Sequence, residues 1–537
     1  MKKFLLVLFF IIFGTFLRLI SIDKAEGLWN DEYISWMISS VAINGGFWNA
    51  VKSQCHMPLY YLYLKLIMTL FGQSDLILRL SSLICGIAAI PVMYYAGKEK
   101  DNYTAVICAL FTSISSFLIY YSQEVRLYSL LFLISALTFL FTVKLIKYPN
   151  KKNLILTLVF NFLIIFTHTI GFVFVFFNLI FISINLFKKY KKFLICLWSV
   201  IFILFISVLP IILKILTTKS FSQWWGHFTL SKICYLFTDY FSPVLVNLTN
   251  APDKFIFTPT MIITGIIAVF FITKSLFKNK LNIGLFAISF CVVTIMTIAS
   301  ISGKLVFITK YSIEIYPILI FLFCCGAASL NNKIIRNIIL SIYFILSIGY
   351  VSLSPISAPR LPRLEGHKLV TDTLKNMNLN SGDFILIEYY PQNRFDKYFD
   401  FSDYNVISVN KGNFPYYLLP DTNYEQTYSN GKELYRNMFL NGHNEYYESM
   451  LKKEIFDKMQ PGQNLVIITL DSVAVYNTEL IQKIAGHDIA YKKTPLLFLI
   501  FSYIKYENFY DTINMLEFRG NEKHGSWTIV KFTKLNK

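Results

Sequence analysis

Long apolar stretches alternate with short polar segments over the first two thirds of the chain. Because the hydrocarbon core of a bilayer is about 30 Å thick, a helix that crosses it needs roughly 20 apolar residues. Eleven stretches approach that length, and each is predicted to form a membrane-spanning helix. These stretches are 4–22, 79–97, 103–121, 127–146, 154–167, 170–187, 193–216, 259–277, 281–301, 311–329 and 334–353. The pattern predicts a mainly α-helical, polytopic membrane protein.

A further apolar stretch runs from Met57 to Phe71 and carries Lys65 near its middle. It is short for a span. If it crossed the membrane, every later loop would change sides. We therefore expect a juxtamembrane helix that lies in the interface.

Lysine and arginine are concentrated in every second loop. With the N-terminus inside, the short inner segments hold 17 of these residues. Cytoplasmic loops are enriched in both residue types. The sequence therefore predicts a multi-pass protein of the cell membrane with a cytoplasmic N-terminus, and it places the residues after 353 outside the cytoplasm.

Charge and hydropathy divide the 537-residue chain into two expected domains. Residues 1–353 carry 29 Lys and Arg against 11 Asp and Glu, whereas residues 354–537 carry 21 of each, so the first part holds the whole net charge of +18. The lysines of the first part lie in short loops between apolar spans, which favours a topological role over nucleic-acid binding. After 354, apolar strand patterns near 383–389, 465–470 and 527–532 alternate with helical ones and predict an extracytoplasmic α/β domain.

Acids, histidines and cations of the membrane part gather in its predicted outer loops. Asp31 and Glu32 follow the first span, Arg79 opens the second, and Glu124 and Arg126 lie between the third and fourth. His56, His168 and Lys310 are the other members of this set, and Tyr128 and Tyr311 lie beside them in the sequence motifs of the same side. A charged side chain near lipid costs roughly 2.5–3.5 kcal/mol on insertion scales. Their gathering on one side indicates chemistry at the outer membrane surface.

Three ordered motifs and a later pair carry a specific resemblance. They are Trp29-Asn30-Asp31-Glu32, His56-Met57-Pro58-Leu59-Tyr60-Tyr61, Tyr120-Tyr121-Ser122-Gln123-Glu124-Val125-Arg126-Leu127-Tyr128, and Lys310-Tyr311. In these residues the chain resembles the bacterial protein O-mannosyltransferase superfamily, close to the lipid A aminoarabinose transferase group. The resemblance implies a GT-C fold and a membrane glycosyltransferase that is inverting in stereochemistry. It implies a polyprenyl-phosphate-linked sugar as donor and a lipid, glycan or protein outside the cytoplasm as acceptor.

The resemblance also implies roles for individual residues. Asp31 is expected to be the base that takes the proton of the acceptor hydroxyl, with Glu32 as its partner or as a structural acid. Arg126 and Lys310 are expected to neutralise the phosphate of the donor. Lys310 stands where relatives usually have Arg, and a lysine offers a point charge without a bidentate fork.

Several of these assignments have a structural alternative. Arg126 can pair with Glu124 at a helix end, and Arg79 can bind phosphate or anchor its helix at the interface. His56 can bind substrate or shape the loop before Pro58. His168 can be a substrate ligand or a polar helix end. Tyr128 and Tyr311 are expected to contact substrate through the motifs that contain them.

The sequence leaves the metal open. Some relatives depend on a divalent metal ion, yet no spacing typical of a metal site is present, and no nucleotide-binding motif occurs. The alternative function is a transporter or flippase of a polyprenyl-linked glycan. That class predicts charges at mid-bilayer and internal symmetry, and the sequence has neither.

Overall fold

A computed structural model of the protein describes residues 2–20, 22, 27–53, 57–187, 190–217, 229, 231–242, 259–302, 307–357, 367–388, 395–409, 453, 455, 457–470, 514–518 and 527–534. The contacts divide the chain into two compact units. The first unit is Met1–Lys24 with Ile34–Pro359, and the second is Ala25–Tyr33 with Arg360–Lys537. The contacts therefore group the segment after the first helix with the later part of the chain, and the boundary at 353 stays a prediction.

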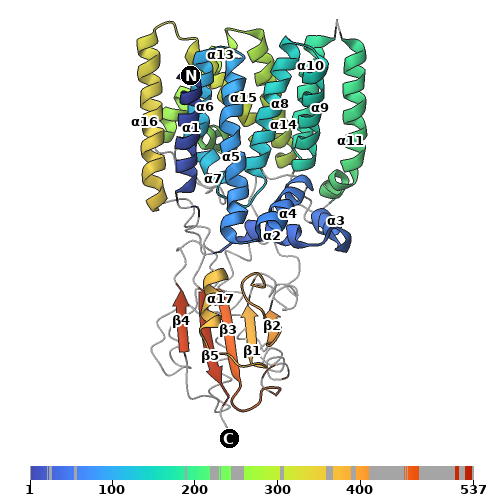
Figure 1. Ribbon diagram of the computed structural model, residues 1–537, viewed down its shortest axis with the longest axis vertical. Helices are drawn as coiled ribbons and strands as arrows, with labels where there is room; N and C mark the ends of the chain where they lie inside the picture. The colour runs from blue at the N-terminus through green and yellow to red at the C-terminus, as the bar shows by residue number, and fades with distance from the viewer. Residues whose placement is uncertain are drawn as a thin grey trace. The chain divides into compact units, whose positions relative to one another are not determined.

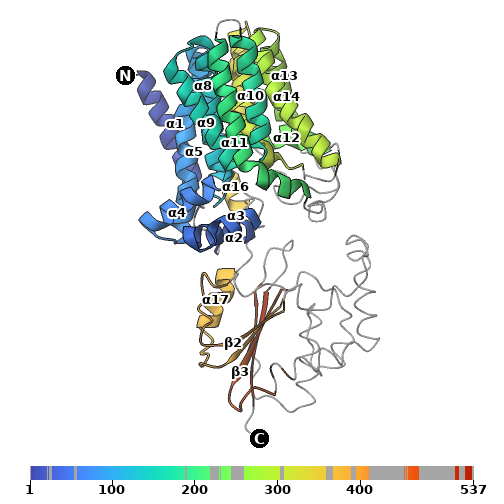
Figure 2. The same ribbon diagram turned by 90° about the vertical axis from the view of Figure 1, so that its right-hand side faces the viewer.

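The first unit is a bundle whose long helices run alongside one another (Figures 1 and 2). Helices overlap all eleven stretches predicted above. The helices of the N-terminal half are α1 (Lys2–Leu19), α2 (Asn30–Ser40), η1 (Ile43–Gly45), α3 (Phe47–Ser53), α4 (Leu59–Phe71), α5 (Asp75–Lys98), α6 (Asn102–Ile114), α7 (Ser116–Tyr121), α8 (Tyr128–Lys147) and α9 (Lys151–Thr167). They are followed by α10 (Gly171–Leu186), α11 (Lys191–Thr217), α12 (Ser231–Phe241), α13 (Pro259–Leu276), α14 (Lys280–Ile301), η3 (Thr309–Ile315), α15 (Tyr316–Ala328) and α16 (Lys333–Ser357).

Five helices of the described residues are long and apolar enough to cross a membrane. They begin at Asp75, Tyr128, Pro259, Lys280 and Thr309. Large apolar side chains such as Ile84, Ile298 and Ile345 are exposed on the outside of the bundle. An apolar exterior of this extent fits a lipid surface, so the protein is a multi-pass membrane protein. The count of eleven spans and the sidedness remain predictions.

The apolar stretch at Met57–Phe71 forms the short helix α4, which lies with α3 at one end of the bundle (Figures 1 and 2). Lys65 has polar partners in the structure. Its ammonium donates to the carbonyls of Ser39 at 3.1 Å and Val41 at 2.9 Å. These carbonyls lie at the C-terminal end of α2, where a cation is favourable because of the helix dipole.

The expectation of one continuous helix over 103–121 is wrong, because two helices meet at Ser115. The Ser115 hydroxyl accepts from the amide of Leu118 at 3.4 Å and so caps α7. The carbonyls of Thr112 and Ser113 at the end of α6 accept from the guanidinium of Arg18, each at 2.9 Å. The break is stable because a buried side chain on α1 replaces the helical hydrogen bonds.

The second unit holds a five-stranded sheet and α17 (His367–Lys375). Its strands are β1 (Phe384–Glu388), β2 (Asn405–Val409), β3 (Asn464–Leu470), β4 (Asn514–Phe518) and β5 (Trp527–Thr533), in the order β2-β1-β3-β5-β4. β1 pairs in parallel with β2 and β3, whereas β5 pairs antiparallel with β3 and β4. Three of these strands coincide with the strand patterns read from the sequence.

Alternate residues of the central strands build the core of this unit. Ile385 and Ile387 of β1 and Val466 and Ile468 of β3 are fully buried. They pack with α17 and with an aromatic cluster around Phe395. Successive side chains of a strand point to opposite faces, so the spacing of two places these residues on one side of the sheet.

Candidate active site

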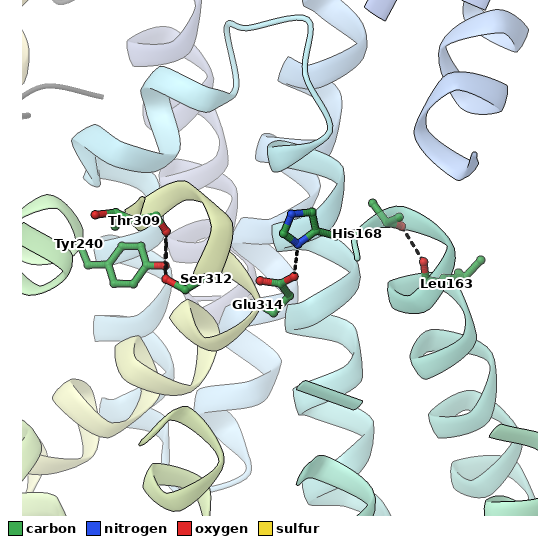
Figure 3. A network of polar contacts seen from close by, with 7 residues as sticks. Leu163, His168, Tyr240, Thr309, Ser312 and Glu314 are labelled. Atoms are coloured by element: carbon green, nitrogen blue, oxygen red, sulfur yellow. Dashed lines mark hydrogen bonds and ion pairs between the residues drawn. The ribbon is translucent and has the colours of Figure 1, made fainter. Parts of the chain in front are cut away.

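The short helix η3 is the centre of a buried polar network in the first unit (Figure 3). The Thr309 hydroxyl donates to Oδ2 of Asp239 on α12 at 2.7 Å. The hydroxyl of Tyr240 donates to the Thr309 carbonyl at 3.1 Å and lies 2.9 Å from the Ser312 hydroxyl. These contacts fix η3 against α12 although the two elements are about 70 residues apart in sequence.

Glu314 and His168 connect the other side of η3 to the end of α9. Glu314 is completely buried, and its Oε1 lies 2.5 Å from Nδ1 of His168 (Figure 3). His168 is the C-terminal cap of α9, as the helix-end alternative expected. It is at the same time the hydrogen-bond partner of a buried carboxylate, so it has more than a capping role.

Lys310 lies between two aromatic rings. Its ammonium is 5.5 Å from the ring centroid of Tyr128 and 5.7 Å from that of Tyr311, and the side chain is buried. The His168 ring is 6.1 Å from the Tyr311 ring. Ring faces attract a cation. The structure thus brings together four of the predicted site residues: Lys310, Tyr311, Tyr128 and His168.

Arg126 lies in the turn between α7 and α8 and is also buried. One guanidinium nitrogen donates to the hydroxyl of Ser35 on α2 at 3.3 Å. Burial raises the pKa of Tyr60 on α4 well above its usual range, and the positive charge of Arg126 acts against that rise. Arg126 therefore has a hydroxyl and a phenol in its surroundings.

The turn that carries Glu124 and Arg126 is fixed from α1. The Gln123 amide donates to the carbonyls of Arg18 at 2.5 Å and Ile20 at 2.9 Å. Nε of Arg18 donates to the Ser122 hydroxyl at 3.1 Å. Glu124 is buried here, and it lies close enough to the Tyr121 hydroxyl to act on it electrostatically, as does Asp239.

Arg79 lies in α5 and is 2% exposed. A snorkelling anchor keeps its charged end at the membrane surface. The burial of Arg79 argues against that alternative.

The two acids of the first motif lie in the first turn of α2. Oε2 of Glu32 accepts from the backbone amide of Trp29 at 3.3 Å. This contact is the acidic half of a capping box, in which the third helical residue binds the amide of the N-cap. Glu32 is buried and Asp31 is half-buried. Adjacent helical residues point about 100° apart, so the two carboxylates have different surroundings.

His56 lies outside the described residues. Within those residues no group of three or more His, Cys, Asp or Glu side chains is arranged to hold a metal ion. The pair of His168 and Glu314 offers two possible metal ligands.

Sequence reasoning missed Arg18, Asp239 and Glu314. Glu314 is the only acid within the eleven predicted spans, and Arg18 is the only charged residue in the interior of the first. Charges at such positions are costly and mark polar partners or function. That signal could have identified both residues, whereas nothing in its local sequence distinguishes Asp239.

Solved structures share this architecture over nearly the whole chain. ArnT from Cupriavidus metallidurans bound to undecaprenyl phosphate aligns with a TM-score of 0.53 and 10% identity, over 98% of this chain and 97% of that chain. ArnT in the apo state gives 0.53 and 11%, over 99% and 98%. The chain has the ArnT fold. This result confirms the fold implied by the motifs.

Three further results complete the comparisons. An oligosaccharyltransferase from Archaeoglobus fulgidus, tethered with an acceptor peptide, aligns with a TM-score of 0.43 and 10% identity over 99% of this chain and 74% of that one. The assignment of the ArnT fold rests on the first two structures alone. No family model matches the sequence. No curated protein matches it either.

Proposed function

We propose that this protein is a membrane glycosyltransferase that uses a polyprenyl-phosphate-linked sugar and an acceptor outside the cytoplasm. The observation that carries the proposal is the ArnT fold over almost the full chain, in a fold whose solved example binds undecaprenyl phosphate. Buried cations support it. Arg79, Arg126 and Lys310 are at most 7% exposed, and fixed, buried cations can neutralise the negative charge that develops on a leaving phosphate.

In the proposed reaction the acceptor hydroxyl oxygen forms a bond to the anomeric carbon of the sugar. The bond between that carbon and the phosphate oxygen breaks, and its electron pair leaves with polyprenyl phosphate. The acceptor proton passes to Asp31, the proposed base. Transfer builds negative charge on the leaving phosphate, which Arg126, Lys310 and Arg79 are proposed to neutralise.

The remaining site residues take substrate-binding roles in this proposal. Tyr128 and Tyr311 flank Lys310 and are proposed to contact the donor beside its phosphate. His168, Glu124 and His56 are proposed to contact sugar or acceptor, and Glu32 to support the helix start that carries Asp31. The acceptor is a hydroxyl-bearing lipid, glycan or protein, and the second unit is proposed to lie on the same, outer side of the membrane.

Turnover by the purified protein tests this function. Protein in lipid nanodiscs is incubated with undecaprenyl-phosphate-linked hexoses and pentoses and a membrane extract as acceptor. We expect release of undecaprenyl phosphate from at least one donor, and Asp31→Asn should abolish it with an unchanged size-exclusion profile. A flippase would instead move the intact lipid-linked glycan across liposomes and release no undecaprenyl phosphate, which would overturn the proposal.

A further inference from the structure

The segment in front of the proposed base is hydrogen-bonded to a side chain from a distant part of its own unit. The backbone amide of Leu28 donates to the hydroxyl of Tyr398 at 2.7 Å. Leu28 lies three residues before Asp31 and is itself buried. Contacts place both partners in the second unit, so this bond is internal to that unit.

The position of Tyr398 is set by the core of the same unit. Its neighbours Phe395 and Phe399 are both part of the hydrophobic core, and its backbone amide donates to the Phe395 carbonyl at 2.8 Å. Two buried aromatic anchors on either side leave the backbone of Tyr398 little freedom. The core of the second unit therefore determines where the phenol oxygen lies.

Gly27, the residue before Leu28, also lies close to Tyr398. Its φ is +96°, and a Cβ built on it would lie 2.9 Å from Cβ of Lys368 on α17 and 3.2 Å from the hydroxyl of Tyr398. A larger residue would be strained by the positive φ and would meet both neighbours. The chain thus passes closely between α17 and Tyr398 just before α2 begins.

The following residues transmit this constraint along the backbone. The amide of Trp29 is bound by the Glu32 carboxylate at 3.3 Å, and the amide of Tyr33 donates to the Trp29 carbonyl at 2.8 Å. Hydrogen bonds from the amides of Leu28, Trp29 and Tyr33 therefore hold the backbone on both sides of Asp31. Asp31 lies within this fixed stretch.

We propose that Tyr398 is a positioning residue that orients the catalytic segment 28–33, which gives the second unit a direct part in catalysis. The inference rests on the proposed function of Asp31. A general base must hold its geometry closely, because a misplacement of about 1 Å can cost roughly a hundredfold in rate. Loss of the Tyr398 oxygen removes the hydrogen bond to the Leu28 amide and changes no group that is proposed to contact donor or acceptor.

Tyr398→Phe tests this proposal because it removes that oxygen and keeps the ring. Tyr404→Phe is the matched control, since it removes the same atom from another tyrosine of this unit, whose ring packs on Phe399 at 5.5 Å. For Tyr398→Phe we expect kcat to fall about tenfold or more, with unchanged binding of undecaprenyl phosphate and unchanged melting temperature. The control should keep the wild-type kcat. A kcat equal to wild type in Tyr398→Phe, or an equal fall in both variants, would overturn the proposal.

Hydrogen exchange of the intact protein separates this inference from the proposed function. Amides of a peptide that covers residues 27–33 should exchange about fivefold faster in Tyr398→Phe and at the wild-type rate in Tyr404→Phe. Unchanged exchange in Tyr398→Phe would refute the attachment whether or not the protein transfers sugar. Faster exchange in a protein without any transferase activity would refute the proposed function alone.

Discussion

Nδ1 of His168, at the end of α9, lies 2.5 Å from Oε1 of Glu314 in η3. The two residues are 146 positions apart, so only the folded bundle brings them together. Glu314 is fully buried and His168 is nearly so. Lys310 and Tyr311 belong to the same short helix as Glu314, and the pair therefore holds the element that presents the proposed phosphate ligand.

His168→Ala should destabilise the protein more than Glu314→Gln does. The alanine leaves a buried carboxylate without its partner, at a cost of about 2 kcal/mol or more, whereas glutamine is a neutral group of the same shape. The double variant should recover part of the loss, with a coupling energy of about 1–3 kcal/mol. Thermal unfolding in detergent provides the measurement. Strictly additive effects would show that the two side chains do not depend on each other.

Lys310→Gln should reduce turnover by about a hundredfold or more, because it removes a fixed charge from the leaving phosphate. Lys310→Arg should keep more activity, since relatives usually carry arginine there. Release of undecaprenyl phosphate measures both. Lys147→Gln is the control. It is a partly exposed lysine that pairs with Glu99 at 3.6 Å, and it should leave turnover unchanged. Equal activity of Lys310→Gln and the control would remove Lys310 from the site.

Glu32→Gln should keep most of the activity that Asp31→Asn abolishes. Glutamine can still accept from the Trp29 amide, so the helix start remains capped. Glu32→Ala lacks this acceptor and should lose about 0.5–2 kcal/mol of stability. Paired assays of turnover and thermal unfolding distinguish the two acids. If Glu32→Gln were inactive and Asp31→Asn active, the roles of base and cap would have to be exchanged.

Arg18→Met should destabilise the bundle by at least about 2 kcal/mol, because it removes the donors to the carbonyls of Thr112 and Ser113 and to the Ser122 hydroxyl. Arg336→Met should cost under about 1 kcal/mol. That guanidinium lies at an exposed site, where it stacks on the Tyr103 ring at 3.8 Å and donates to Oδ1 of Asn337 at 3.3 Å.

Gly86→Ala should also lower the stability of the bundle, as Arg18→Met does. Its Cβ would lie 2.0 Å from the Ser122 hydroxyl and 3.2 Å from Nε of Arg18. Chemical unfolding compares the three variants. A tolerated Arg18→Met would mean that the break at Ser115 needs no side-chain support.

Local pattern was sufficient for the helices but not for their interruptions. The sequence predicts α5, α8 and α14 because a helix that packs against a bundle or lipid needs apolar residues at regular spacing. The strands β1, β3 and β5 are visible for the same reason. The break between α6 and α7 has no comparable signal in the local sequence, because Arg18, which supports it, lies about 95 positions away.

The sequence alone determined a helical membrane protein, its motifs, and the residue types that a phosphate and an acceptor hydroxyl require. Only the tertiary structure decided which partners the charged and polar groups have. Glu314 meets His168, Asp239 meets Thr309, and Leu28 meets Tyr398. The physical reason is that hydropathy is a property of each residue and its near neighbours, whereas the cost of a buried charge depends on the atoms placed beside it by distant parts of the chain.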